Sequence, residues 1–322
     1  MRDTINILCS MDSNYVPYYG VMLTSLFLSN KEERFEVYVI TNDTRVGAFD
    51  TLQQLVQRFR HKLHIIQIPK ELISRLKSNQ FLGGHLSIAT YYRLLSVGSL
   101  PNDVHKILYM DGDMVIDGSI RPLWDIDVSH VGLAGAIDCL YFDSDIYLRL
   151  DYPSSQGYFN AGVLLLNLDY LREHCFTERA LSFMEQNIDK LRFHDQDVLN
   201  KILVDAKMAI PLKYNFQYFY IMQSHWEHYN AQLKADILAE AEHPVIVHYC
   251  GPGKPWHMTY IYRQYDKLWW KYAVLSLWHI RRQWKPITRS LKWLTKVLLM
   301  KTHIWPRTHL GLPTELADMK LN

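Results

Sequence analysis

Short apolar runs and longer amphipathic segments alternate along the chain. The apolar runs predict buried strands at Ile5–Cys9, Glu36–Ile40, Leu63–Ile68, Lys106–Met110, Val131–Ile137, Val163–Leu166 and Val245–Tyr249. The segments between them predict helices at Tyr18–Ser29, Val46–Arg60, Ile88–Val97 and Thr177–Ile188. Strands that alternate with helices at this spacing are typical of a protein with a largely parallel sheet and crossover helices. We therefore expect an α/β fold.

Polar side chains stand next to the ends of these predicted strands. They are Asp12, Asn14, Asp111, Asp113, Asp138, Asn160 and His248. The carboxyl ends of parallel strands share one edge of a sheet, and open α/β sheets bind their ligands at that edge. A single shared site is the simplest explanation of the pattern.

The segment Asp111-Gly112-Asp113 follows an apolar run directly and is a candidate metal site. Carboxylates at positions i and i+2 of an extended chain point the same way, and Gly112 lets the backbone approach a ligand closely. Like charges so placed repel each other unless a cation lies between them, and Mg²⁺ or Mn²⁺ accepts such oxygen ligands. The alternative is an ordinary solvated turn. An EF-hand loop is excluded, because Ile116 and Pro122 replace its required glycine and glutamate.

The last predicted strand ends at His248 and leads into a glycine-rich turn. The backbone amides of Gly251 and Gly253 can cradle an anion, and Lys254 is a point charge suited to a diphosphate. A neutral imidazole beside two carboxylates gives a mixed ligand set that Mn²⁺ accepts. Arg93 lies on a predicted helix that can pack near the same edge and bind phosphate or orient a carboxylate. For Arg93, an ordinary surface position with a buried stem remains the alternative.

Five segments together resemble the family 8 retaining glycosyltransferases, which include glycogenin and bacterial lipopolysaccharide galactosyl- and glucosyltransferases. The segments are Asp12–Tyr15, Asp111–Asp113, Phe159–Val163, Asp195–Asp197 and His248–Trp256. Each motif alone is weak, but all five occur in the family's order. The resemblance extends from about Ile5 to Trp256. It implies a GT-A fold, in which a nucleotide-binding α/β sheet continues into an acceptor-binding half, and we expect this catalytic domain over residues 1–266.

The resemblance also implies roles for individual residues toward a UDP-sugar donor. The residues implied to lie at the uracil and ribose are Asp12, Asn14 and Gly112. Those implied to bind Mn²⁺ (or Mg²⁺) are Asp111, Asp113 and His248. Those implied to hold the diphosphate or the donor sugar are Lys254, the amide of Gly251, Arg93, Asn160 and Asp195. Those implied to face the acceptor are His85, Asp138 and Cys250. Arg93 is further expected to brace the Asp-x-Asp turn.

Gln196 is implied to lie under the anomeric carbon of the donor sugar. A double-displacement route to retention needs a carboxylate nucleophile at that place, whereas an amide is a feeble nucleophile. We therefore predict front-face substitution through an oxocarbenium-like transition state, in which the leaving phosphate accepts the proton of the incoming hydroxyl. Asp195 remains the rival nucleophile.

The C-terminal region, residues 267–322, differs in charge from the rest of the chain. Between residues 267 and 313 there are ten Lys or Arg, no Asp or Glu, and six of the nine tryptophans. The pattern predicts helices at 267–284 and 287–300, the second with an apolar stripe opposite its basic residues. Tryptophan beside Lys and Arg is typical of a helix in an anionic membrane interface. A helical pair packed on the catalytic domain is the alternative, and nucleic-acid binding is disfavoured because no reading motif accompanies the charge.

The four cysteines are scattered, which argues against a zinc cluster or a disulfide framework and fits a reducing compartment. The first residues lack the apolar core of a signal peptide, and we find no uncharged apolar run of the roughly 18 residues that a membrane-spanning helix needs. We therefore expect a cytoplasmic protein that is peripheral at the inner face of the cytoplasmic membrane.

The function that we predict is transfer of a hexose, galactose or glucose, from a UDP-sugar to lipopolysaccharide or another lipid-linked saccharide. A nucleotidyltransferase is disfavoured, because the segment Ser10–Tyr15 after the first strand is not the glycine-rich basic loop that such enzymes need. A catalytically inactive, membrane-peripheral saccharide-binding protein on the same fold is the alternative.

Overall fold

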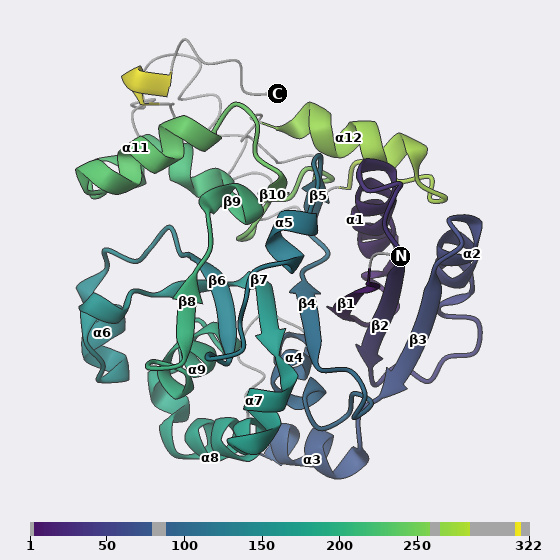
Figure 1. The fold of residues 1–322 in the computed structure, drawn as a ribbon, viewed down its shortest axis with the longest axis horizontal. Coiled ribbons are helices and arrows are strands. Elements are labelled where there is room, and N and C mark those ends of the chain that lie inside the picture. Colours follow the sequence, from purple (N-terminus) through teal and green to yellow (C-terminus); the bar gives the residue numbers. More distant parts are fainter. Residues whose placement is uncertain (1–2, 79–87, 258–264, 284–312, 317–322) are drawn as a thin grey trace.

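The computed structural model describes residues 3–78, 88–257, 265–283 and 313–316, and Figure 1 shows their arrangement. Seven strands form the main sheet in the spatial order β3 (Lys62–Gln67), β2 (Phe35–Thr41), β1 (Ile5–Ser10), β4 (Lys106–Met110), β7 (Phe159–Asn167), β6 (Leu133–Ile137) and β8 (Lys207–Ala209). Only β7 runs antiparallel to its neighbours, so the sheet is mostly parallel. The predicted α/β class is confirmed.

Helices cover both faces of this sheet, as the alternation of side chains along β1 illustrates. Ile7 and Cys9 point to the face packed by α1 and α2, whereas Leu8 points to the face packed by α4, α8 and α9. Because both faces are buried, the central strands β4 and β7 are mostly apolar, whereas the edge strand β3 is partly exposed. The α-helices are α1 (Val16–Ser29), α2 (Asp50–Arg58), α3 (Lys70–Ser78), α4 (Tyr92–Ser96), α5 (Arg121–Trp124), α6 (Ser144–Leu150), α7 (Leu168–Glu173), α8 (Phe176–Asn187), α9 (Asp195–Ile202), α10 (Gln223–Trp226), α11 (Ala231–Glu240) and α12 (Asp266–Leu275).

Two of the helices predicted before residue 266 are shorter in the structure than their pattern indicated. The helix expected from Val46 begins only at Asp50, because Gly47 has a φ of 76°, which is incompatible with a right-handed helix. The helix expected at Ile88–Val97 is a 3₁₀ turn, Ile88–Tyr91, followed by the short α4. The helix predicted at Thr177–Ile188 corresponds to α8, whose bounds differ by one residue.

A second, three-stranded sheet continues from the main one and consists of β5 (Met114–Ile116), β10 (Ile246–His248) and β9 (Phe216–Gln217). Strand β5 starts just after Asp111 and Asp113, and β10 pairs with it in the antiparallel sense so that His248 lies opposite Met114. The expectation that every polar strand end lies on one parallel sheet is therefore wrong for His248. This side chain reaches the same place through the second sheet.

Helix α12 packs against α1 beside β5 (Figure 1). The hydroxyls of Ser29 and Tyr272 are 3.1 Å apart, and the Trp278 ring lies against the backbone of Gly20, where a side chain would leave it no space.

The predicted helix 267–284 ends at Leu275, while the one predicted at 287–300 lies outside the described residues. The division into domains at residues 266 and 267 stays a prediction. Among the described residues, no helix is both long and apolar enough to cross a membrane.

Candidate active site

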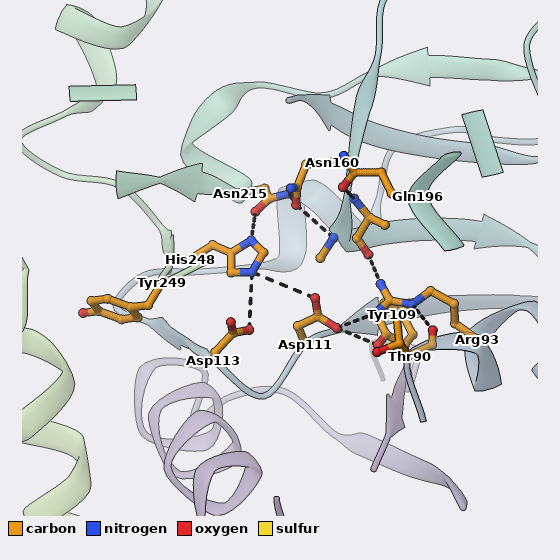
Figure 2. A network of polar contacts seen from close by, with 12 residues as sticks. Thr90, Arg93, Tyr109, Asp111, Asp113, Asn160, Gln196, Asn215, His248 and Tyr249 are labelled. Carbon is orange, nitrogen blue, oxygen red and sulfur yellow. Dashed lines mark hydrogen bonds and ion pairs between the residues drawn. The ribbon is translucent and has the colours of Figure 1, made fainter. Parts of the chain in front are cut away.

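The two aspartates of the Asp-x-Asp segment meet His248 at the junction of the two sheets (Figure 2). Ligand atoms of Asp111, Asp113 and His248 all lie within 4.8 Å of one another. His248 Nε2 is 3.3 Å from Asp113 Oδ1 and 3.9 Å from Asp111 Oδ2. The amide of Tyr249 donates to the carbonyl of Asp113 at 2.8 Å, which fixes the spacing between β10 and the aspartates. Two carboxylates and an imidazole in this arrangement fit a divalent cation such as Mn²⁺ or Mg²⁺.

Two glycines make this close packing possible. A Cβ on Gly112 would lie 2.6 Å from the ring of Tyr19, and a Cβ on Gly162 would lie 2.2 Å from Cε1 of His248. Both values are far below a normal contact distance. The absence of a side chain at Gly162 therefore lets the imidazole lie directly against β7.

Arg93 connects the metal-binding end of the site to α9. Its guanidinium donates to Asp111 Oδ1 at 2.9 Å and lies 2.8 Å from Asp195 Oδ2, while the ring of Tyr109 lies 4.2 Å below it. Tyr109 also donates to Asp111 Oδ1 at 2.6 Å. Burial lowers the pKa of Arg93, but the charges of Asp111 and Asp195 outweigh it and raise the pKa above its ordinary value. Arg93 is therefore charged and braces the Asp111 carboxylate, as expected, whereas its alternative as a surface residue is wrong because only 8% of it is exposed.

Asp195 is buried and shares the cation Arg93 with Asp111. Burial is the main cause that raises the pKa of Asp195 to about 7; Arg93 opposes this shift and the negative charge of Asp111 adds to it. The preceding residue, His194, has a φ of 53° and makes a hydrogen bond of 2.8 Å with the hydroxyl of Tyr91. The start of α9 is thus held by two contacts, Asp195 with Arg93 and His194 with Tyr91.

Lys254 forms an ion pair with Asp113 Oδ2 and donates to the carbonyl of Tyr249 at 2.9 Å. Burial raises the pKa of Asp113, but the positive charge of Lys254, together with the contact to His248, outweighs it and holds the pKa below its ordinary value. The predicted diphosphate lysine therefore lies directly beside the predicted metal ligands. Gly251 follows in the same turn with a φ of 79°, a conformation that favours glycine.

Gln196, Asn160 and Asp138 form a second polar group next to the first. Gln196 Oε1 accepts from the amide of Ala161 at 2.9 Å, and its Nε2 donates to Asp138 Oδ2 at 3.1 Å. The same Asp138 oxygen accepts from Asn160 Nδ2 at 2.8 Å, and Asp138 Oδ1 accepts from the amide of Leu140 at 2.8 Å. Gln196 and Asn160 are thus fixed in orientation by their neighbours.

Of the remaining predicted residues, the structure describes Asp12, Asn14 and Cys250. Asp12 and Asn14 follow β1, where Asp12 Oδ1 accepts from the amide of Asn14 at 2.9 Å. Cys250 is half-buried beside His248, and burial together with the negative charge of Asp138 raises the pKa of its thiol. His85 lies outside the described residues.

Sequence reasoning missed three residues that hold the site together. Tyr109 contacts Asp111, Asn215 contacts His248, and Asp43 Oδ2 accepts from the amide of Ser13 at 3.0 Å. The period of a strand could have identified Tyr109, since it lies two residues before Asp111 on the same face. Asn215 is one of two polar residues, with Gln217, in an aromatic segment and carried no comparable signal.

The comparisons with known proteins agree with this geometry. The sequence model of the family described as "Glycosyl transferase family 8" matches residues 6–260. The lipopolysaccharide 1,2-glucosyltransferase of Escherichia coli K12 is 29% identical over 266 residues, which are 81% of this chain and 75% of that protein. The lipopolysaccharide 1,3-galactosyltransferase of Salmonella typhimurium LT2 is 27% identical over 79% of this chain and 74% of its own length. The crystal structure of the galactosyltransferase LgtC with donor and acceptor sugar analogues superimposes with a TM-score of 0.75 at 24% identity, covering 91% of this chain and all of that one, which confirms the fold.

Proposed function

The chain belongs to glycosyltransferase family 8, and from this membership we propose that it is a metal-dependent, retaining hexosyltransferase with a UDP-sugar donor. The observation that carries the proposal is the grouping of Asp111, Asp113 and His248 within 4.8 Å. Oxygen and imidazole ligands suit Mn²⁺, and the ammonium of Lys254 beside them suits a diphosphate. Asp12 and Asn14, at the end of β1, are the residues that we assign to the uracil and ribose.

A divalent cation bound at this centre would neutralise the charge that develops on the departing diphosphate. Side chains of the protein also stabilise the negative charge on the departing diphosphate. Lys254, which is paired with Asp113, supplies a positive charge beside the diphosphate, and Arg93 holds Asp111 in place through the 2.9 Å hydrogen bond. We assign the amide of Gly251 to the same diphosphate, because its left-handed backbone belongs to the turn that carries Lys254.

For the chemical step we propose front-face substitution with retention. Gln196 is the residue that we place under the anomeric carbon, and its side-chain oxygen already accepts a hydrogen bond from Ala161. Asp195 is engaged with Arg93, and its pKa of about 7 leaves it partly protonated at neutral pH. Neither side chain is therefore a free carboxylate nucleophile. The leaving phosphate oxygen takes the proton of the acceptor hydroxyl while the new glycosidic bond forms.

The acceptor that we propose is a lipid-linked saccharide such as lipopolysaccharide, presented at the inner face of the cytoplasmic membrane. The named functions of the E. coli and Salmonella relatives support this class of acceptor. Helix α12 supports the location, because it buries Leu268 and Trp269 on the protein while Val274 and Leu275 are exposed beside Lys271. An exposed apolar pair with a basic neighbour is suited to an anionic lipid surface. We assign Asp138 and Cys250, together with His85, to the acceptor side.

The test is a panel of UDP-hexoses and one GDP-hexose, each with and without Mn²⁺, scored by protection against thermal unfolding and by slow hydrolysis of the donor. We expect protection and hydrolysis with one UDP-hexose only when Mn²⁺ is present. Asp113→Asn should abolish both, whereas Asp169→Asn, an exposed carboxylate at the opposite edge of the sheet, should leave both unchanged.

Two results would decide against the proposal. Equal hydrolysis without any divalent cation would remove the metal-dependent mechanism. Protection by a UDP-hexose without hydrolysis, and without transfer to a lipopolysaccharide acceptor, would favour an inactive saccharide-binding protein on the same fold.

A further inference from the structure

A chain of hydrogen bonds determines the orientation of the two side-chain amides, Asn160 and Asn215, between β7 and His248 (Figure 2). It starts at the backbone N–H of Gly162, which can only donate and which lies 2.9 Å from Asn160 Oδ1. This contact identifies the oxygen of the Asn160 amide. The other end of that amide, Nδ2, consequently faces Asp138 Oδ2 at 2.8 Å, where a donor is needed.

The assignment passes from Asn160 to Asn215. Asn215 Nδ2 lies 2.9 Å from Asn160 Oδ1, and because that oxygen accepts, Asn215 must present its NH₂ group there. Its own oxygen then lies 2.9 Å from His248 Nδ1. An amide oxygen has no proton to give, so Nδ1 of His248 carries the hydrogen. A neutral His248 therefore has its lone pair on Nε2, the atom that faces Asp111 and Asp113.

We infer that Asn215 is a positioning residue that selects the metal-binding tautomer of His248 and ties it to the residues on the sugar side. This inference rests on the proposed metal-dependent function. Asn215 is fully buried, and Asn160 and His248 are nearly so, which means that water cannot easily replace a lost partner in this chain. Groups behind a metal ligand orient it and fix its tautomer, and their loss typically weakens metal binding about 10–100-fold.

The same amide also reaches the other half of the site. Asn215 donates to Asn160, Asn160 donates to Asp138, and Asp138 also accepts from Gln196. The residue proposed under the anomeric carbon and the residue proposed to bind the cation are thus joined by buried hydrogen bonds. Movement of Asn215 would disturb both groups at once, because each amide in the chain has one orientation that satisfies its neighbours.

The experiment compares Asn215→Leu with Asn167→Leu. Asn167 is a buried asparagine at the opposite end of β7, where it caps α7. Free Mn²⁺ is titrated by electron paramagnetic resonance, and the protonation of His248 is observed by NMR of ¹⁵N-labelled imidazole, with His248→Gln to assign its signal. We expect Asn215→Leu to bind Mn²⁺ about 10–100-fold more weakly and to lose the Nδ1–H tautomer. Asn167→Leu should be destabilised but keep the wild-type affinity and tautomer.

A second variant, Asn215→Asp, separates the two contacts. Its carboxylate can still accept from His248 but cannot donate to Asn160, so we expect the Nδ1–H tautomer to persist and UDP-sugar affinity to fall. Loss of that tautomer in Asn215→Asp, or wild-type Mn²⁺ affinity in folded Asn215→Leu, would overturn the inference. If the wild-type protein bound no Mn²⁺, the proposed metal centre would fail, and the imidazole spectra alone would then decide the role of Asn215.

Discussion

The Cα of Gly162 lies so close to His248 that a methyl group there would stand 2.2 Å from the imidazole Cε1. His248 cannot retreat easily, because it is buried and its Nδ1 is hydrogen-bonded to Asn215. Gly162 therefore determines how near the imidazole comes to β7, and through this contact it determines where Nε2 points.

The first prediction follows from this contact. Gly162→Ala should displace His248 and weaken Mn²⁺ binding at least about tenfold, which is the lower end of the effect of disturbing a metal ligand's surroundings. Titration of Mn²⁺ by electron paramagnetic resonance measures the effect. Gly98→Ala is the matched control, because a Cβ on Gly98 meets nothing within 4 Å. Equal affinities in the two variants would contradict the prediction.

The second prediction concerns Gly112, between the two aspartates. Gly112→Ala would place a methyl group 2.6 Å from the ring of Tyr19, which is buried and whose hydroxyl donates to the carbonyl of Ser10 at 2.9 Å. We expect a loss of about 1–3 kcal/mol in the free energy of unfolding, the usual cost of overpacking. Urea denaturation of Gly112→Ala against Gly98→Ala measures it. A difference smaller than about 0.5 kcal/mol would show that Tyr19 moves aside without cost.

A site residue could be predicted when a pattern in the neighbouring sequence indicates its position. The carboxylates Asp111 and Asp113 follow an apolar run, so their place at a strand end was readable from the sequence. The direction of β7 was not, because an apolar run is the same in either direction. Asn160 precedes most of β7 and still reaches the carboxyl edge, since this strand runs antiparallel to β4.

The contacts that hold the site together were the hardest to predict. Asn215 bonds to His248 and to Asn160, which are far from it in sequence, and neither spacing nor periodicity encodes such a partner. Gly47 delayed the start of a predicted helix for a local reason, its left-handed backbone, and Gly-based rules could have identified it. Periodicity therefore predicts which elements are buried, whereas the network behind the metal ligands requires the three-dimensional structure.

The third prediction separates the two routes to retention. Gln196→Ala should slow turnover about thirtyfold or less, because it removes a neutral side chain whose two hydrogen bonds, to Ala161 and Asp138, are each worth about 1 kcal/mol. Steady-state kinetics with the preferred UDP-hexose measures kcat. Asp195→Asn should lower kcat as well, since it breaks the contact with Arg93, but it should leave measurable transfer. Complete loss of activity in Asp195→Asn, with a glycosyl adduct trapped on Asp195 of the wild-type protein, would overturn front-face substitution.

The fourth prediction is a pH dependence of stability. Burial raises the pKa of Asp195 from 3.8 to about 7, so the folded protein keeps a proton that the unfolded chain has released between these values. The contribution of Asp195 to stability must therefore fall as the pH rises from about 4 to 7. Urea denaturation of metal-free protein across this range should show that fall in the wild type relative to Asp195→Asn. Parallel curves for the two proteins would rule out the raised pKa.

The fifth prediction concerns the exposed end of α12. Val274 is 81% exposed and Leu275 is 54% exposed, next to the basic side chain of Lys271. If this surface enters an anionic lipid interface, each apolar side chain contributes about 1.5 kcal/mol or more when it is buried there. Val274→Ser with Leu275→Ser should therefore weaken sedimentation with anionic vesicles at least about tenfold, and neutral vesicles should bind the wild type less than anionic ones do.

The control for this surface is Leu148→Ser, which removes an apolar side chain that is 80% exposed on α6 and lies away from α12 (Figure 1). Removing any exposed leucine can reduce non-specific adsorption of the protein to vesicles. If α12 is a specific docking surface, Leu148→Ser should therefore sediment with anionic vesicles as the wild type does. Both variants lie away from the metal-binding residues, and donor hydrolysis in solution should stay at the wild-type rate in each. If the α12 double variant and Leu148→Ser lost vesicle binding equally, or if neither did, α12 would not be the membrane-facing surface, and the acceptor would have to reach the site by another route.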